Sequence, residues 1–360
     1  MFSAARALTL LVLTTAATPA QAPASFDELS TRANAARAAD RLPEAINLYQ
    51  QALQLKPDWT EGWWYLGTLF YDADRYADGR QAFAQFVQRT GTPPGLAFLG
   101  LCEFETGDYP QSLDHLQKAL AAGLPSDIEP VARFHQALLL TRLGDFQEAW
   151  RHYRPLVAQG SHDPTLIAAL GLNALNKALL PKEIPADQHE LIAAAGQTAN
   201  TWLAGDTTKT EAAFHSLLSA YPNAPGVHNL YATYLLSAHP DEALPEFRRE
   251  LELNPHDSEA RAMLSVLLFK GGNHAEALPL AQKAAEERPA SPLTQYAYGL
   301  ALPDPRQSIE HLEIAARLDP SNLEVHLALA GAYSKAGRHD DARRERKLSI
   351  QLAKETDPRH

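Results

Sequence analysis

The sequence repeats itself at intervals close to 34 residues. Pro222, Pro255, Pro289 and Pro320 follow one another at spacings of 33, 34 and 31 residues, and Leu99-Gly100 follows the Leu-Gly pair at 66–67 after 33 residues. Self-similarity at such a period is typical of repeat proteins, in which each unit buries its apolar surface against its neighbours. We therefore expect one long array rather than two or three unrelated domains.

Each repeat carries the pattern of two helices joined by a short turn. The segment Trp63–Phe70 reads W-x2-L-G-x2-F, and turn signals such as Gly144-Asp145-Phe146 recur. Small residues stand where second helices are expected, which allows two helices to approach closely. These small residues are Ala45, Ala149, Ala243, Ala277 and Ala342. Sustained alternation of apolar and polar residues is lacking, so the sequence does not predict strands.

The 25 prolines would oppose a helical protein if they were scattered through helices. Placed against the period, Pro57 and the four prolines above fall where second helices should end, so each closes a repeat. The exceptions fall where a regular repeat would not place them, and they mark departures from the pattern. These exceptions are Pro181, Pro185, Pro303 and Pro305.

On these residues the chain resembles the tetratricopeptide repeat (TPR) family, whose signature is W-x2-L-G-x2-Y, A-x3-F and P in a helix–turn–helix unit of about 34 residues. The resemblance implies an all-α protein, a right-handed α-solenoid of about eight to ten repeats. The expected repeats are 26–59, 60–92, 93–126, 130–163, 164–190, 191–223, 224–257, 258–291, 292–322 and 323–356. The fifth lacks a clear second helix, and the ninth is short.

The N-terminal segment 1–22 has the pattern of a secretory signal peptide. One cation, Arg6, precedes the apolar run 7–13, and small residues lead to Ala20-Gln21-Ala22, with cleavage expected after Ala20 or Ala22. We therefore predict an exported protein, periplasmic or secreted. The alternative is an uncleaved amphipathic helix.

The expected organisation follows from these segments. An N-terminal subarray spans 23–179, an irregular connection 180–190, and a C-terminal subarray with a closing helix 191–356, before a tail at 357–360. The connection could be a hinge between the subarrays.

Composition and motifs exclude several function classes. The formal net charge of −11 argues against a general nucleic-acid binder. The apolar run 7–13 is too short to span a bilayer, and no other apolar run approaches that length. The single cysteine, Cys102, can form no intramolecular disulfide and is expected to be a small buried residue. Motifs for a nucleophile, a phosphate loop or a metal are absent, so we predict no enzyme activity, catalytic residue, cofactor or metal.

The resemblance implies that inner positions of first helices line a concave binding face. Nine residues map there, and the aromatic ones could dock a protein or peptide; alternatively, their rings pack between repeats. Trp64 and Trp202 are the strongest candidates for exposure. The full set is Trp64, Tyr71, Phe104, Phe134, Arg142, Trp202, Phe269, Lys270 and Tyr296. A carboxylate clamp is not expected, because Thr68, Leu101 and Val266 stand where it would need asparagine.

Two functions fit this sequence. The first is a non-enzymatic adaptor that binds a protein or peptide along the concave face, in the cell envelope. The second is a TPR-containing enzyme or small-ligand-binding protein with a site in 180–200. The chemistry available there is limited to Lys182, Glu183, Asp187, His189 and Glu190, which match no catalytic template.

Overall fold

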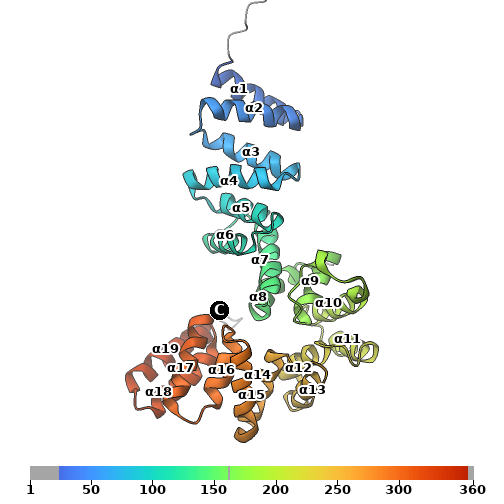
Figure 1. The fold of residues 1–360 in the computed structure, drawn as a ribbon, viewed down its shortest axis with the longest axis vertical. Coiled ribbons are helices and arrows are strands. Elements are labelled where there is room, and N and C mark those ends of the chain that lie inside the picture. The colour runs from blue at the N-terminus through green and yellow to red at the C-terminus, as the bar shows by residue number, and fades with distance from the viewer. Residues whose placement is uncertain (1–23, 161–162, 356–360) are drawn as a thin grey trace, which may run out of the picture. The chain divides into compact units, whose positions relative to one another are not determined.

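The computed structural model describes residues 24–160 and 163–355, and there the chain is all-helical (Figure 1). These residues form 19 α-helices and two short 3-10 helices, with no strand among them. This confirms the predicted all-α solenoid. The chain divides into two compact units, residues 1–122 and 123–360, which we describe separately as unit 1 and unit 2. The signal-peptide prediction concerns residues outside the described ranges.

Unit 1 consists of three antiparallel helical hairpins. Its core is a cluster of buried apolar side chains that includes Tyr49, Leu66 and Phe70. The helices are α1 (Phe26–Ala38), α2 (Leu42–Leu55), α3 (Thr60–Asp72), α4 (Tyr76–Thr90), α5 (Pro93–Glu105) and α6 (Tyr109–Ala122).

Close approach within these hairpins depends on the predicted small residues. A Cβ at Gly67 would lie 2.8 Å from the ring of Phe83, and one at Gly100 would lie 2.9 Å from Leu116. Both contacts are closer than packed carbon atoms allow, so glycine lets the second helix lie against the first. The predicted reason for the Leu-Gly pair is therefore confirmed. Cys102 is buried in this packing, as expected, and burial raises the pKa of its thiol to about 12.

Unit 2 contains six hairpins and one additional helix within its described residues. The paired helices are α7 (Glu129–Leu143) with α8 (Phe146–Ala158), α10 (His189–Leu203) with α11 (Thr207–Ala220), α12 (Val227–Ala238) with α13 (Pro240–Leu253), α14 (Ser258–Lys270) with α15 (His274–Glu287), α16 (Pro292–Ala301) with α17 (Pro305–Leu318), and α18 (Leu323–Lys335) with α19 (His339–Glu355). The additional helix is α9 (Pro164–Ala174).

The irregular segment replaces the second helix of the fifth repeat. After α9 come two 3-10 helices, Pro181–Glu183 and Ala186–Gln188, and α10 then packs directly on α9. A Cβ at Gly171 would lie 1.9 Å from the carbonyl oxygen of Ile192. A Cβ at Gly196 would lie equally close to the carbonyl oxygen of Ile167. The helices on either side of the segment, α9 and α10, are thus in backbone contact.

The prolines follow the predicted rule at helix ends and break it elsewhere. Pro57, Pro222, Pro255, Pro289 and Pro320 each lie two residues beyond the end of a second helix, as predicted. Three other prolines, Pro155, Pro245 and Pro279, lie inside helices. These three prolines neither close a second helix nor belong to the exceptions named from the sequence. Each such proline forfeits one backbone hydrogen bond, and the packing of the remaining helix outweighs that loss.

Within the described residues, no helix is both long enough and apolar enough to cross a membrane.

Candidate protein-binding surface

The predicted binding residues lie on the first helices of the hairpins, and their environments differ sharply. Phe104 and Tyr296 are 6% and 8% exposed, so both are buried among their neighbours. Neither presents a face that a partner could reach, and their packing with adjacent helices accounts for their aromatic character.

In unit 1, Trp64 belongs to a cluster of aromatic rings. Its ring meets Phe98 edge-on at 5.4 Å between centroids, and it also contacts Phe83 and Phe86. Tyr71 contacts the same Phe98 at 5.5 Å. Phe98 belongs to α5, so these rings join consecutive repeats. Trp64 and Tyr71 are half-buried, and packing between repeats explains most of their contacts.

In unit 2, Trp202 occupies a similar position. It is half-buried and meets Trp150 at 6.1 Å and Tyr234 at 6.0 Å, both edge-on. Trp150 lies on α8 and Tyr234 on α12, so Trp202 links helices from three hairpins. Beside it is a small pocket of about 20 Å³, too small for a peptide side chain.

Arg142 holds the irregular segment in place. Its Nε lies 3.1 Å from Oε2 of Glu183, and that carboxylate also accepts the backbone N–H of Leu180 at 2.8 Å. The ion pair therefore fastens the first 3-10 helix to α7. Glu183 was one of the few polar groups available for a ligand site in 180–200, and it is engaged in this structural role.

Phe134 and Phe269, by contrast, line pockets on the surface of unit 2. Phe134 borders a pocket of about 360 Å³ with Pro130, Val131 and Leu156. Phe269 borders one of about 460 Å³ between α14, α16 and α18. Phe134 and Phe269 are half-buried, as Trp64, Tyr71 and Trp202 are, and each of the two lines one of these open pockets. Lys270 is exposed beside the second pocket.

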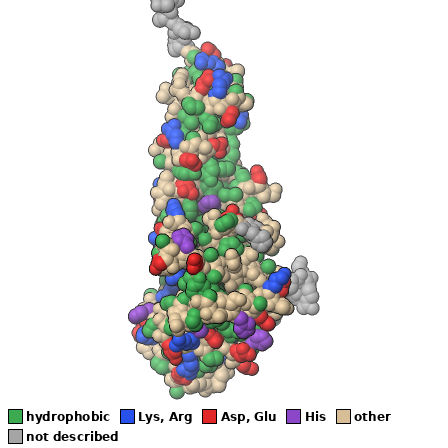
Figure 2. Space-filling model, turned by 90° about the vertical axis from the view of Figure 1, so that its right-hand side faces the viewer, with side chains coloured by type: hydrophobic (Ala, Val, Ile, Leu, Met, Phe, Trp, Pro, Cys, Tyr) green, Lys and Arg blue, Asp and Glu red, His purple; other side chains and the backbone are tan. Residues whose placement is uncertain are grey.

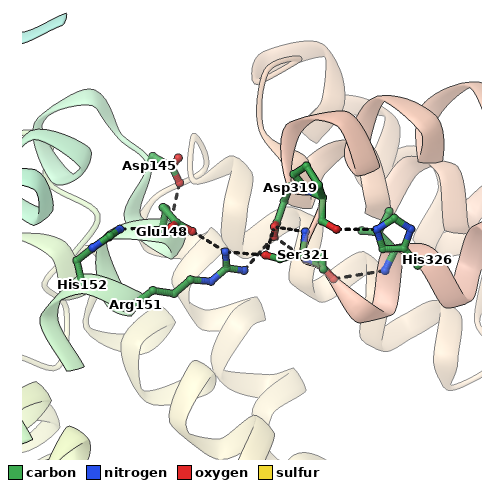
Figure 3. Close-up of polar contacts among 10 residues, drawn as sticks. Asp145, Glu148, Arg151, His152, Asp319, Ser321 and His326 are labelled. Carbon is green, nitrogen blue, oxygen red and sulfur yellow. Dashed lines mark hydrogen bonds and ion pairs between the residues drawn. The ribbon is translucent and has the colours of Figure 1, made fainter. Parts of the chain in front are cut away.

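Unit 2 also closes on itself through contacts that the repeat pattern does not predict. Figure 3 shows Arg151 extending from α8 towards the loop between α17 and α18. Its guanidinium lies 3.1 Å from Asp319 and donates to Ser321 Oγ at 3.0 Å. From the first turn of α18, His326 Nε2–H donates to the carbonyl of Pro320 in this loop at 2.9 Å.

A second closing contact involves Arg288, just beyond the end of α15. Its Nη2 donates to the carbonyl oxygen of Gly144 at 2.8 Å, and its Nη1 lies 3.1 Å from Glu259. Gly144 adopts the left-handed conformation that ends α7, with φ of 80°. The turn between α7 and α8 thus lies against α14 and the segment after α15.

The charges in this closing contact shift one another's pKa values. Burial raises the pKa of Glu259 to about 7, with Asp257 and Asp145 adding to the rise and Arg288 opposing it. Burial would also raise the pKa of Asp319. Hydrogen bonds from Ser321 and the positive charge of Arg151 outweigh burial there and hold the pKa below its usual range.

The surface charges show no large area of one sign on the face drawn in Figure 2, where acidic and basic side chains are interspersed. Among the described residues, no group of three or more histidine, cysteine, aspartate or glutamate side chains is arranged to hold a metal ion.

The closing residues Arg151, Asp319, Arg288 and Glu259 were not predicted as functional. Arg151 and Asp319 are 168 residues apart, and Arg288 is 144 residues from Gly144 and 29 from Glu259. These residues occupy helix faces and loops outside the repeat signature. No signal in the sequence pairs them.

Sequence profiles described as tetratricopeptide repeat match most of this architecture. One profile matches residues 30–93, 98–164 and 233–292, which is more than half of the chain, and a second matches 300–345. The chain belongs to the tetratricopeptide repeat family. The stretch from 165 to 232 lies outside these matches, and it contains α9 except its first residue, the irregular segment and Trp202.

Three solved structures illustrate what this chain matches at low sequence identity. MamA from Desulfovibrio magneticus RS-1 is 19% identical, covers 47% of this chain and 97% of its own, and has a TM-score of 0.38. The Cut9–Hcn1 hetero-tetramer of the APC/C matches at 13% identity over 91% of this chain and 66% of that chain, with a TM-score of 0.42. Yeast Tom70 matches at 12% identity, 91% and 92% coverage and a TM-score of 0.29. A comparison with curated proteins finds no match.

Proposed function

We propose that this protein is an exported, non-enzymatic adaptor that binds a protein or peptide on the first helices of unit 2. The observation that carries the proposal is the pocket beside Phe269, which is lined by the first helices α14, α16 and α18 together with residues of α15 and α17. Members of the TPR family bind proteins or peptides, and the family's profiles match residues 30–93, 98–164, 233–292 and 300–345 of this chain.

The two accessible aromatic sites favour binding of a chain rather than catalysis. Both pockets are open to solvent and lined mainly by apolar side chains, with few polar groups converging in either. Apolar anchors of this kind take side chains from an interaction partner. Catalysis would need several positioned acids, bases or nucleophiles, and the linings hold few such groups, namely His274, Ser308 and Lys335 in one pocket and Asp163 in the other.

Site-specific photo-crosslinking in the native cell envelope tests the binding surface. A photo-reactive amino acid at Phe269 or Phe134 is expected to give the same discrete adduct. The matched control is the same amino acid at Lys283, which is exposed on the second helix α15. Adducts that form equally from Lys283, or from none of the three positions, would contradict the proposed surface.

Export is the part of the proposal that rests on segment 1–22. Intact-mass measurement of the protein purified from its native cells tests it directly. We expect a chain that begins at Gln21 or Pro23, recovered with the envelope or the medium. A mass that retains Met1, with the protein in the cytoplasmic fraction, would rule export out.

A further inference from the structure

The largest of the pockets described above exists because one first helix is too short. α16 has 10 residues, whereas α14 and α18 on either side of it have 13 each. After Ala301 the backbone becomes extended at Leu302 and reaches Pro305, the first residue of α17. The last turn that α16 lacks leaves a space between the ends of α14 and α18.

This space is the pocket of about 460 Å³. Its walls are Phe269 of α14, Leu300 and Leu302 at the end of α16, and Ala328 of α18, and Leu312 of α17 lies at its base. The volume falls within the range of about 300–1,000 Å³ typical of ligand sites. An apolar hollow of this size on the surface of a folded chain is suited to an apolar group supplied by another molecule.

Gly331 keeps the pocket open from the α18 side. It lies inside a helix, where glycine costs roughly 1 kcal/mol relative to alanine. At Gly67, Gly100 and Gly299 an added Cβ would meet the paired second helix, but at Gly331 it would meet nothing within 4 Å. Close helix packing therefore does not require this glycine, and its consequence is space in the pocket.

The rim of the pocket offers a free positive charge. Lys335 lines the pocket from the last turn of α18, is exposed, and has no ion-pair partner among residues 24–160 and 163–355. On the opposite side, Lys270 lies 3.3 Å from Glu324, which compensates its charge. A partner that carries a carboxylate next to its apolar group would complement Lys335.

We propose that this pocket receives a bulky apolar side chain of a partner peptide, with an adjacent carboxylate of that peptide paired to Lys335. This inference rests on the proposed function and specifies the chemistry of its ligand. The pocket is open to solvent beside the C-terminal ends of α14, α16 and α18, so a peptide lying across those ends can insert one side chain into the space that the missing turn of α16 leaves. The neighbouring acidic residue then reaches Lys335 at the rim.

Binding of a defined peptide to the full mature chain tests the proposal. The probe is acetyl-Ser-Glu-X-Glu-Ser-amide with X as 4-fluorophenylalanine, titrated by fluorine NMR, and the comparison peptide has alanine at X and is measured by competition. Loss of one buried aromatic ring is expected to weaken binding about tenfold or more. Equal affinity for the two peptides, or no binding of the aromatic probe, would overturn the proposal.

Two substitutions of Gly331 distinguish a loss of peptide binding in the pocket from a loss of folding. Gly331→Leu fills the space and is expected to weaken binding of the probe peptide about tenfold or more. Gly331→Ala leaves most of the volume, and its affinity for the probe is expected to stay within about twofold of wild type. Both substitutions raise helix propensity, so neither should lower the unfolding midpoint. Unchanged binding in Gly331→Leu would show that the probe lies elsewhere and would refute this site.

Two charge-reversal variants test the proposed ion pair between Lys335 and the carboxylate of the peptide. Lys335→Glu is expected to weaken the probe about threefold, since an exposed ion pair contributes little. Lys347→Glu makes the same charge change on the exposed face of α19 and should leave the affinity for the probe unchanged. Equal effects of the two variants would refute the pairing with Lys335. Tighter binding of decanoate than of the aromatic peptide would assign the pocket to a free amphiphile instead.

The crosslinking experiment at Phe134 keeps the two proposals distinguishable. If its adduct persists in Gly331→Leu and the pentapeptide does not bind, the pocket assignment fails and the adaptor function stands. If neither Phe134 nor Phe269 gives an adduct, the adaptor function itself fails.

Discussion

Arg151 of α8 lies 3.1 Å from Asp319, although 168 residues separate them in the sequence. In a solenoid each repeat normally contacts only its neighbours. Here, the second helix of the first hairpin in unit 2 reaches the loop before its last hairpin. Together with Arg288, this pair makes unit 2 a closed arrangement of repeats rather than an open row.

The two closing contacts should contribute unequally to stability. Arg151 is half exposed, so Arg151→Ala is expected to lower the free energy of unfolding by less than about 1 kcal/mol. Arg288→Ala removes the partner of the buried Glu259 and the donor to the Gly144 carbonyl, and we expect a loss of about 2–3 kcal/mol. Urea unfolding, with hydrogen exchange of α14 and α15 to localise the effect, measures both. A larger loss in Arg151→Ala would contradict this ranking.

Glu259 should make the stability of unit 2 depend on pH. Its pKa is raised to about 7 in the folded chain from an ordinary value near 4.5, so the folded state retains a proton that the unfolded state has released. The stabilisation that the raised pKa of Glu259 gives to the folded state is complete below about pH 4.5 and is lost as the pH rises through about 7. Glu259→Gln should abolish this dependence.

The measurement is the unfolding free energy of wild type and Glu259→Gln at several pH values between 4 and 8. The difference, wild type minus variant, is expected to fall across this window. Asp257, Asp145 and Arg288 face the same carboxyl and are unchanged in the variant, so they do not produce the difference by themselves. A flat or rising difference would disprove the assigned role of burial.

Three glycines inside helices should respond in opposite ways to the same substitution. Gly171→Ala and Gly196→Ala each place a Cβ 1.9 Å from a backbone carbonyl oxygen of the facing helix, so α9 and α10 must separate. We expect losses of about 3 kcal/mol or more for each. Gly331→Ala meets open space and is expected to stabilise by about 0.5–1 kcal/mol.

Thermal unfolding of the three alanine variants checks this contrast. Because the chemical change is identical, differences in helix propensity cancel and the surroundings of each glycine decide the outcome. A Gly196→Ala variant as stable as wild type would show that α9 and α10 do not pack through their backbones.

The two tryptophans expected to be most exposed should act mainly on stability. Trp202→Ala removes a ring that links α8, α10 and α12, and Trp64→Ala removes one that joins α3 to α5. Each is expected to cost about 3 kcal/mol, the usual loss for a large packed aromatic side chain. Chemical denaturation measures the loss, and a cost below about 1 kcal/mol would indicate that the ring is free for a partner.

The repeat pattern predicted most helices because it records local geometry. Proline placement, the Leu-Gly pairs and the small residues of second helices define each hairpin by contacts within some 30 residues. Pro57 and Pro320 lie where they were expected, and so do the close contacts of Gly67 and Gly100. The short ninth repeat was also visible in the sequence, from Pro303 and Pro305, but the pocket that it creates was not.

The binding residues were harder to predict, because an inner helix position can face either a neighbouring repeat or solvent. Phe104 and Tyr296 carry the same kind of signal as Phe134 and Phe269 in the sequence. The first two are buried and the last two line pockets, because the neighbours differ in length and bulk.

The sequence by itself determined the helical hairpins, their order and the repeat family, since each of these follows from short-range spacing of apolar residues, glycine and proline. Only the tertiary structure decided which aromatic rings remain accessible, and it alone joined Arg151 to Asp319 and Arg288 to Gly144. Those relationships depend on how small rotations accumulate from repeat to repeat within unit 2. No short-range pattern in the sequence specifies the total rotation across these repeats.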